Sequence, residues 1–306
     1  MTNISFTGLS KRFFTLSLTI IAVIAVASLV LGVQLDVQFK GGSIITYSYE
    51  GELDKEAFAK TAQDLTETTI SIQESTDIAT GRGTMVLTLP GSKSLTAEQM
   101  VAVTEGLQTQ FPENNPQTLS ISNVSATMGA EFLAKCLTAV AFASLLMIVY
   151  VSFRFRRIGG WAAGVMGVVA LTHDIIMVFG VFVLLRIPLN GNFIAVVLTI
   201  LGYSLNDTIV IYDRIRENKK LRGDKLSLAE LVDLSINQSF RRTLNTTITT
   251  VLAMVIVTIV AYIYNVESII TFSGPMILGL ISGVYSSICI AGPLWVRWHN
   301  YRDARA

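Results

Sequence analysis

Two carboxylates lie within stretches of the sequence that are otherwise apolar or small. Asp207 follows Asn206 in "LGYSLNDTIV", and Asp174 follows His173 in "ALTHDIIMVFG". Insertion scales assign an aspartate at the centre of a membrane-spanning helix a cost of about 2.5–3.5 kcal/mol. Groups that carry such a cost are by default candidates for ion or proton pathways, each with a partner to be identified.

The sequence offers a cation for Asp207 at the start of a later apolar stretch. In "RRTLNTTITT", Arg242 precedes Thr246 and Thr247, which lie about one to two helical turns deeper and could hold water. A carboxylate whose charge is balanced by a movable arginine can take up a proton on one side of a membrane and release it on the other. We therefore predict a proton path through Asp207, Arg242 and Asn206.

Four further residues are candidates for polar support of this path: Asp174, His173, Thr246 and Thr247. A structural role, in which they join helices or contact a partner subunit, fits His173 and Asp174 better. Two simpler interpretations stay open for the main pair. Asp207 could end a helix in solvent, although it precedes Arg214 by about two turns, and Arg242 could be an interfacial anchor of the positive-inside kind.

Other chemistries fit the same residues less well. An intramembrane aspartyl protease would show GxGD, which "SLND" does not match. A metal site needs several ligands at close spacing, and the only histidines are His173 and His299. The chain has neither a P-loop nor a Rossmann glycine pattern, so we expect no cofactor and protons as the coupling ion. A proton crossing about 100 mV releases about 2.3 kcal/mol, so several protons can drive a conformational cycle.

Composition places the chain in a membrane. Of its 306 residues, 51% are hydrophobic and 15% are charged, and the mean hydropathy is +0.56. Soluble domains carry about 25% charged residues. Both cysteines, Cys136 and Cys289, lie in apolar stretches, so we expect neither a disulfide framework nor a thiolate metal site.

Six stretches are long enough to cross a bilayer about 30 Å thick, which takes about 20 helical residues. The predicted spans are 13–33, 130–152, 159–185, 192–212, 244–264 and 271–296. The first could instead be a secretory signal, because Lys11 and Arg12 precede an apolar run with small residues at Ala25 and Ala27. The run continues through "SLVLGV", which is long for a signal, and an uncleaved span is the prediction.

Residues 34–129, between the first two spans, have the pattern of a soluble domain. The predicted elements are strands at 43–49, 69–75, 84–90 and 118–124 and helices at 53–67 and 95–109. Strand-helix-strand-strand-helix-strand is the order of a ferredoxin-like α+β domain. The domain is acidic, with 12 Asp and Glu against 5 Lys and Arg.

Basic residues gather on one side of the predicted bundle, in the two ends of the chain (1–12 and 297–306) and in two loops. They are Lys11, Arg12, Arg154, Arg156, Arg157, Arg214, Arg216, Lys219, Lys220, Arg222, Lys225, Arg241, Arg242, Arg297, Arg302 and Arg305. By the positive-inside rule this side is cytoplasmic. Both termini are then cytoplasmic and 34–129 is periplasmic, and no nucleic-acid partner is needed to explain the charge.

Several motifs give the whole chain a resemblance to a known family. They are "FKGGS" after the first span, "THDIIMVFG", "GYSLNDTIVIYDRIREN" and "RRTL". With these motifs the chain resembles the SecD/SecF family of the resistance-nodulation-division superfamily. Two departures are small: Thr172 stands where the family usually has Ala, and Val178 where it has Thr. They weaken a role for the His173–Asp174 pair and leave the Asp207 motif intact.

The resemblance implies a polytopic α-helical membrane protein whose six helices form half of a resistance-nodulation-division bundle. Such a chain would pair with SecD behind the SecYEG channel in a bacterial inner membrane, with YajC and YidC as further partners. The complex would use the proton gradient to promote late steps of translocation of unfolded polypeptide. Asp207 and Arg242 would belong to the proton path, and Gly41 and Gly42 would form a hinge after the first span.

Two other functions stay open. The chain could export a small molecule or lipid, although such exporters usually carry two six-span halves in one chain. It could also be a scaffold for its partner with no proton step of its own. Replacement of Asp207 by Asn would distinguish a scaffold from a proton-driven subunit.

Overall fold

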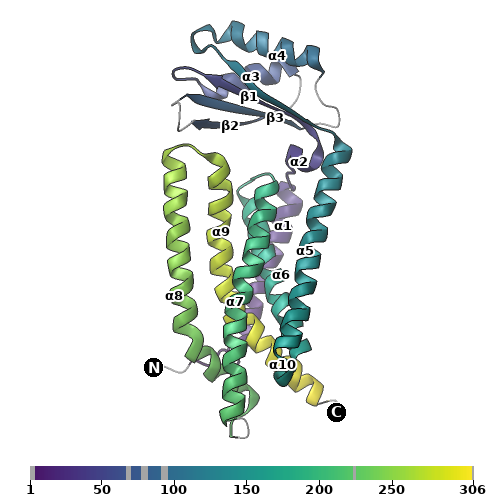
Figure 1. The fold of residues 1–306 in the computed structure, drawn as a ribbon, viewed down its shortest axis with the longest axis vertical. Coiled ribbons are helices and arrows are strands. Elements are labelled where there is room, and N and C mark those ends of the chain that lie inside the picture. The colour runs from purple at the N-terminus through teal and green to yellow at the C-terminus, as the bar shows by residue number, and fades with distance from the viewer. Residues whose placement is uncertain (1–3, 67–69, 77–81, 91–95, 223–224, 305–306) are drawn as a thin grey trace.

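The computed structural model describes residues 4–66, 70–76, 82–90, 96–222 and 225–304. A bundle of long helices carries a small α+β domain at one end, and both termini lie at the opposite end (Figure 1). Three predicted boundaries, at positions 67, 69 and 95, lie outside the described residues.

The predicted number of spanning helices is confirmed. Within the described part of the chain, six helical segments are long and apolar enough to cross a membrane. They are α1 (Ser10–Leu31), α5 (Ala126–Arg154), α6 (Gly160–Leu184), α7 (Gly191–Arg222), α8 (Leu228–Ile263) and the run of α9 (Glu267–Ser286), a π-helical segment (Ser287–Ala291) and α10 (Gly292–Asp303). The central helices are α6, α7 and α9, while α1, α5 and α8 are mostly exposed.

Two of these helices extend well beyond the predicted spans. Helix α7 continues past residue 212 to Arg222, and α8 begins at Leu228 instead of 244. The extension of α7 is polar and is supported by ion pairs of Arg214 with Glu217 (2.6 Å) and Arg216 with Asp213 (2.8 Å). A capping box between Ser227 and Glu230 starts α8. A hydropathy window finds only the apolar part of such helices.

Close packing of α9 on α7 depends on glycine. A Cβ atom at Gly279 would lie 1.9 Å from Cδ1 of Ile200, and one at Gly283 would lie 3.1 Å from Oγ of Ser204. Small residues let membrane helices approach closely in this way. Helix α9 can therefore bring its side chains directly against α7.

The α+β domain has the predicted topology. Its elements are β1 (Gly42–Tyr49), α3 (Lys55–Thr66), β2 (Ser71–Thr76), β3 (Gly83–Pro90), α4 (Ala97–Gln110) and β4 (Gln117–Val124), with a 3₁₀ turn at Pro112–Asn114. The strands form one antiparallel sheet in the order β2-β3-β1-β4, which is the ferredoxin-like order. Helices α3 and α4 cover the sheet face that points away from the spanning bundle (Figure 1).

The core of this domain follows the alternation of the strands. Ile45 and Tyr47 on β1, with Leu87 on β3, point to the helices and pack with Phe58 of α3. The short helix α2 (Val37–Lys40), which Asp36 caps, was not predicted, because a single turn carries too little periodicity to detect. Burial raises the pKa of the Asp36 carboxyl, and the hydrogen bond from the Gln38 amide partly offsets this.

The two connections of the domain to the bundle meet at one place. Gly42, the first residue of β1, pairs with Val124, the last residue of β4. The preceding glycine has φ +86°, and a Cβ atom there would lie 2.6 Å from the backbone nitrogen of Ala126 at the start of α5. Gly41 and Gly42, predicted as a hinge, therefore lie against the root of α5.

We expect Gly41→Ala to lower the free energy of unfolding by about 2–4 kcal/mol, because it adds a backbone clash to a strained φ. Gly32→Ala is the matched control, since Gly32 has φ +72° with nothing within 4 Å of a Cβ. That control is expected to cost only about 1–2 kcal/mol. Thermal unfolding of the full chain in detergent measures both, and equal losses would show that the contact with Ala126 is unimportant.

The segment before α1 is attached to the start of α8. Asp233 accepts hydrogen bonds from the amide of Thr7, the hydroxyl of Thr7 and the hydroxyl of Ser5, each at 2.8 Å. Asn237 donates to the carbonyl of Ile4 at 2.8 Å. One carboxylate and one amide thus hold the N-terminal segment on α8.

Asp233→Asn is expected to release this segment. The substitution replaces one carboxylate oxygen, which accepts hydrogen bonds, by an amide NH₂ group, which cannot accept them from the hydroxyls of Ser5 and Thr7. Hydrogen bonds to a charged group contribute about 1.5 kcal/mol or more to the free energy of opening this segment. Their loss should make amide exchange at Thr7 roughly tenfold faster. Hydrogen-exchange mass spectrometry of residues 4–9 measures this. Asp303→Asn, at the other end of the chain, serves as control, and unchanged exchange in Asp233→Asn would contradict the attachment.

Candidate functional site

Asp207 is buried in the interior of α7 with only 2% of its surface exposed. Its Oδ2 atom has no hydrogen-bond partner among the described residues. A buried charged group left without a partner carries its full desolvation penalty. Asp207 therefore needs a proton or a nearby cation to be stable at this position.

The nearest candidate cation is Arg242, which lies on α8 with its side chain exposed. It is close enough to Asp207 to act on it electrostatically. The ion pairs formed within the described part of the chain do not include one between these two residues. The arginine thus lies within electrostatic range of the carboxylate, and the two form no ion pair within the described residues.

Helices α7 and α8 run antiparallel, and hydrogen bonds on both sides of Asp207 fix their register. Tyr203 donates to Thr250 at 3.1 Å, and Asn218 donates to Ser235 at 2.9 Å. Counting along both helices from these bonds places Asp207 level with the turn of α8 around Thr246.

The threonines on this turn of α8 differ in their environment. Thr243 and Thr247 are buried, and their hydroxyls have no partner in the described part of the chain. Thr246 is exposed, and its hydroxyl donates to the carbonyl of Arg242 at 2.9 Å. Thr247 and Thr243, not Thr246, are therefore the hydroxyls free to bond at this level. Thr243 was missed in the sequence, although its spacing of one turn from Thr247 puts both on one face.

Asn206, the third residue of the predicted proton path, is exposed, whereas its neighbour Asp207 is buried. Both follow Tyr203, which bonds Thr250 of α8, by about one turn. The place of Asn206 in the proton path stays a prediction.

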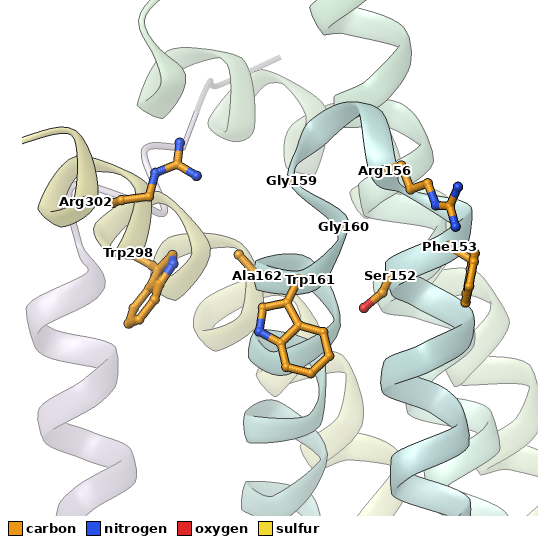
Figure 2. Close-up of a pocket in the computed structure, with 9 residues that line it drawn as sticks. All are labelled: Ser152, Phe153, Arg156, Gly159, Gly160, Trp161, Ala162, Trp298 and Arg302. Carbon is orange, nitrogen blue, oxygen red and sulfur yellow. The ribbon is translucent and has the colours of Figure 1, made fainter. Parts of the chain in front are cut away.

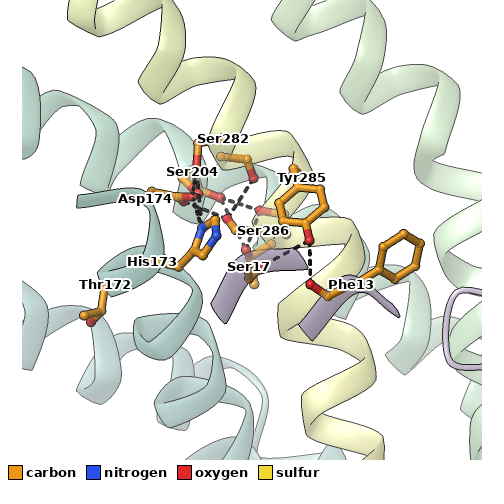
Figure 3. A network of polar contacts seen from close by, with 12 residues as sticks. Phe13, Ser17, Thr172, His173, Asp174, Ser204, Ser282, Tyr285 and Ser286 are labelled. Atoms are coloured by element: carbon orange, nitrogen blue, oxygen red, sulfur yellow. Dashed lines mark hydrogen bonds and ion pairs between the residues drawn. The ribbon is translucent and has the colours of Figure 1, made fainter. Parts of the chain in front are cut away.

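The second carboxylate, Asp174, is completely buried and fully bonded (Figure 3). Its Oδ2 accepts from the hydroxyls of Ser204 at 2.8 Å and Ser286 at 2.7 Å, and its Oδ1 accepts from Ser282 at 2.6 Å. These donors come from α7 and α9, and Asp174 lies on α6. We call Asp174 with these three serines the Asp174 cluster. It joins the three central helices.

His173 connects this cluster to α1. Its Nδ1 lies 3.3 Å from Oδ1 of Asp174, and its ring lies against Tyr285, with centroids 5.7 Å apart. Tyr285 donates to the carbonyl of Phe13 at 2.9 Å and bonds Ser17 at 3.0 Å (Figure 3). The Nε2 atom of His173 has no partner among the described residues. Ser282, Ser286 and Tyr285 were missed in the sequence, although the two serines are spaced one turn apart.

A short hydroxyl bridge lies between the two carboxylates. Thr208, next to Asp207, pairs with Ser287 at 2.8 Å, and Ser287 also donates to the carbonyl of Ser204 at 3.2 Å. Ser287 begins the π-helical segment after α9. Such segments are frequent at functional sites, because they break the regular helix ladder.

The two aspartates therefore have opposite surroundings. Asp174 accepts hydrogen bonds from three hydroxyls, which stabilise a buried negative charge. Asp207 lacks a donor at Oδ2 within the described residues and has a guanidinium nearby. The first arrangement suits a fixed charge that holds helices together, and the second suits a carboxyl group that gains and loses a proton.

Within the described residues these features define a class: a membrane protein with six helices able to span a bilayer, an inserted α+β domain and a buried acid whose Oδ2 has no partner there. The family described as protein export membrane protein SecD/SecF, C-terminal, matches residues 103–301. The chain belongs to the SecD/SecF family of protein-export membrane proteins.

Its relatives include separate subunits and fused chains. Protein translocase subunit SecF of Alicyclobacillus acidocaldarius is 33% identical over 95% of this chain and 91% of its own length. Protein translocase subunit SecDF of Bacillus subtilis is 32% identical over 96% of this chain, which covers 38% of that longer protein.

Solved structures agree with these relatives. The crystal structure of SecDF from Thermus thermophilus, a translocon-associated membrane protein, matches 97% of this chain with 29% identity and a TM-score of 0.79. A SecDF structure in a super-membrane-facing form matches with a TM-score of 0.65. In both cases this chain covers 39% of the solved chain.

Proposed function

We propose that the chain is an auxiliary subunit of the Sec protein-export translocase that works with a SecD partner. Its task is to use the proton gradient to promote late steps of translocation and release of unfolded polypeptide. The observation that carries this proposal is the buried Asp207, unpartnered at Oδ2 among the described residues, beside Arg242, in a chain of the SecD/SecF family.

The geometry supports a simple proton step. Asp207 takes up a proton when Arg242 is away from it, and releases the proton when the guanidinium approaches and stabilises the carboxylate. Thr243 and Thr247 offer hydroxyls at the same level of α8, and α8 carries the arginine. Movement of α8 along α7 therefore changes the charge state of Asp207, and a change in that charge state moves α8.

The partner is inferred from the fused relatives. This chain covers 38% of the Bacillus subtilis SecDF protein, and the larger part of that protein lies outside the match. A SecD partner would supply the corresponding part for this chain. The SecYEG channel, YajC, YidC and the translocating polypeptide complete the assembly, and membrane lipid surrounds it.

The orientation follows from charge. The end of the bundle that holds both termini also holds the basic loops (Figure 1). By the positive-inside rule this supports a cytoplasmic location for that end, in a bacterial inner membrane. The acidic α+β domain then lies in the periplasm, where it can meet emerging polypeptide.

Two other functions account for fewer of the observed features than a proton-driven subunit does. A scaffold without a proton step has no use for a buried carboxylate whose Oδ2 lacks a partner among the described residues, because such a group costs stability. An exporter of a small molecule or lipid fits less well with relatives that are named as protein translocase subunits.

Reconstitution tests the proposal. Vesicles that contain the channel, its motor and this chain with its SecD partner should release more translocated polypeptide when an inward proton gradient is imposed. An uncoupler should remove the increase. Absence of any gradient effect in a complex that co-purifies intact would leave only the scaffold, and gradient-driven efflux of a small solute would favour the exporter.

A further inference from the structure

A groove lies at the end of the bundle opposite the α+β domain (Figure 1), and Figure 2 shows the side chains that line it. It has a volume of about 560 Å³ and lies between the last turn of α5, the first turn of α6 and α10. Neither Asp207 nor the Asp174 cluster lines it. The groove therefore calls for an explanation separate from the proton step.

Exposed tryptophan side chains line this groove. The chain contains three tryptophans, and two of them, Trp161 (68% exposed) and Trp298 (48% exposed), line the groove. The third, Trp295, is fully buried. Exposed indoles at the end of spanning helices are typical of the interface between headgroups and acyl chains.

Two arginines lie at the outer rim of the groove. Arg156 packs over the ring of Phe153 at 4.3 Å and has no ion pair within the described residues. Arg302 pairs only with its exposed neighbour Asp303, at 3.2 Å, in that same part of the chain. Figure 2 shows both guanidiniums near the level of the turn between α5 and α6, with the two indoles toward the spanning helices.

The positive charge continues beside the groove. A second hollow of about 800 Å³ shares Phe153 and Arg156 with it and adds Lys219 and Lys220. The carboxylates nearby are already paired: Asp213 bonds Arg154 and Arg216, and Glu217 bonds Arg214. The net field at Arg156 is therefore positive.

The floor of the groove is formed by backbone and one hydroxyl. Gly159 and Gly160 line it, and a Cβ atom at Gly160 would lie 2.2 Å from the carbonyl oxygen of Ser152. The Ser152 hydroxyl is buried without a partner among the described residues and points toward Trp161 (Figure 2).

We propose that this groove binds the phosphate headgroup of an anionic phospholipid, with the acyl chains along the exposed apolar face of α5. Arg156 and Arg302 line the groove from opposite sides (Figure 2) and supply the positive charge that attracts the phosphate, for which guanidinium is well suited. Leu146, Tyr150 and Phe153 continue the exposed face into the bilayer. A free phosphate ion would use the arginines but neither the indoles nor this face.

Tryptophan fluorescence tests the proposal on the full chain. The chain is reconstituted in phosphatidylcholine vesicles doped with brominated phosphatidylglycerol or, in a parallel set, with brominated phosphatidylcholine. Trp161 and Trp298 are expected to be quenched more strongly by the anionic lipid, while buried Trp295 supplies a constant background that also reports folding. In the double variant Arg156→Gln with Arg302→Gln, the preference for the anionic lipid is expected to fall roughly thirtyfold, at about 1 kcal/mol for each of the two basic residues.

Matched variants decide the result. Arg156→Lys with Arg302→Lys keeps the charge and should keep most of the preference, and Arg222→Gln with Arg241→Gln removes two charges elsewhere and should keep all of it. Equal quenching by both lipids in the unmodified chain would overturn the proposal, as would the same loss in the control pair. Inorganic phosphate should not displace the brominated lipid beyond chloride at equal ionic strength, and displacement would assign the site to free phosphate instead.

Discussion

Asp207→Asn is expected to abolish the stimulation of polypeptide release by a proton gradient in the reconstituted complex. The amide cannot carry a proton between two states, so release should fall to the level measured without a gradient. The folded state should not suffer, because a buried carboxylate unpartnered at Oδ2 is replaced by a neutral group of the same shape. Release assays with and without an imposed gradient measure the first effect, and thermal unfolding measures the second.

Asp213→Asn is the matched control on the same helix. Asp213 is half-exposed and bonds Arg154 and Arg216 at the polar end of α7, so its replacement should leave gradient stimulation in place. Arg242→Gln should reproduce the loss seen in Asp207→Asn, and the double variant should lose no more than either one. Full stimulation in Asp207→Asn would refute the proton step.

Asp174→Asn is expected to have the opposite profile. It removes an ionised acceptor from three serine hydroxyls on two other helices, and the loss should be about 2–4 kcal/mol of unfolding free energy. Secretion should fall in proportion to the amount of folded complex. Thermal unfolding in detergent and the yield of intact complex measure this.

Variants of the serines measure how much each hydroxyl contributes to the loss of unfolding free energy in Asp174→Asn. Ser204→Ala and Ser282→Ala should each cost about 1–2 kcal/mol, and either should cost much less in the Asp174→Asn background. Full additivity would show that the hydroxyls are not held by the carboxylate. If Asp174→Asn instead kept its stability and lost gradient stimulation, Asp174 would belong to the proton path and the division between the two acids would be wrong.

The sequence predicted the elements well where the pattern was periodic. Strands and helices of the α+β domain and the apolar cores of the spans follow directly from alternation and hydropathy. Alternation and hydropathy did not predict the polar continuation of α7 to Arg222 or the early start of α8 at Leu228. These helix ends are stabilised by ion pairs and a capping box. Such interactions leave no periodic pattern of apolar residues in the sequence, so a hydropathy analysis does not find them.

For the site, the two aspartates and Arg242 were named from the sequence, and the serine hydroxyls that bond Asp174 were not. An aspartate in an apolar stretch is visible as an anomaly, so Asp207 and Asp174 both stood out. Which of them is bonded depends on the rotation of helices about their axes, which places Ser282 and Ser286 opposite Asp174 and Thr247 near the level of Asp207. Serine and threonine are common in membrane helices, and only packing distinguishes the few that matter.

The attachment of the α+β domain has a mechanical consequence. Because Gly42 and Val124 are paired, both covalent connections leave the sheet at one corner. The domain can therefore rotate about that corner when the bundle changes its tilt. A strand of about eight residues reaches roughly 25 Å from that corner, so a rotation of about 10° displaces its far end by about 4 Å. Small changes of tilt at the root of α5 are thus amplified into movements comparable to the length of one residue of extended polypeptide.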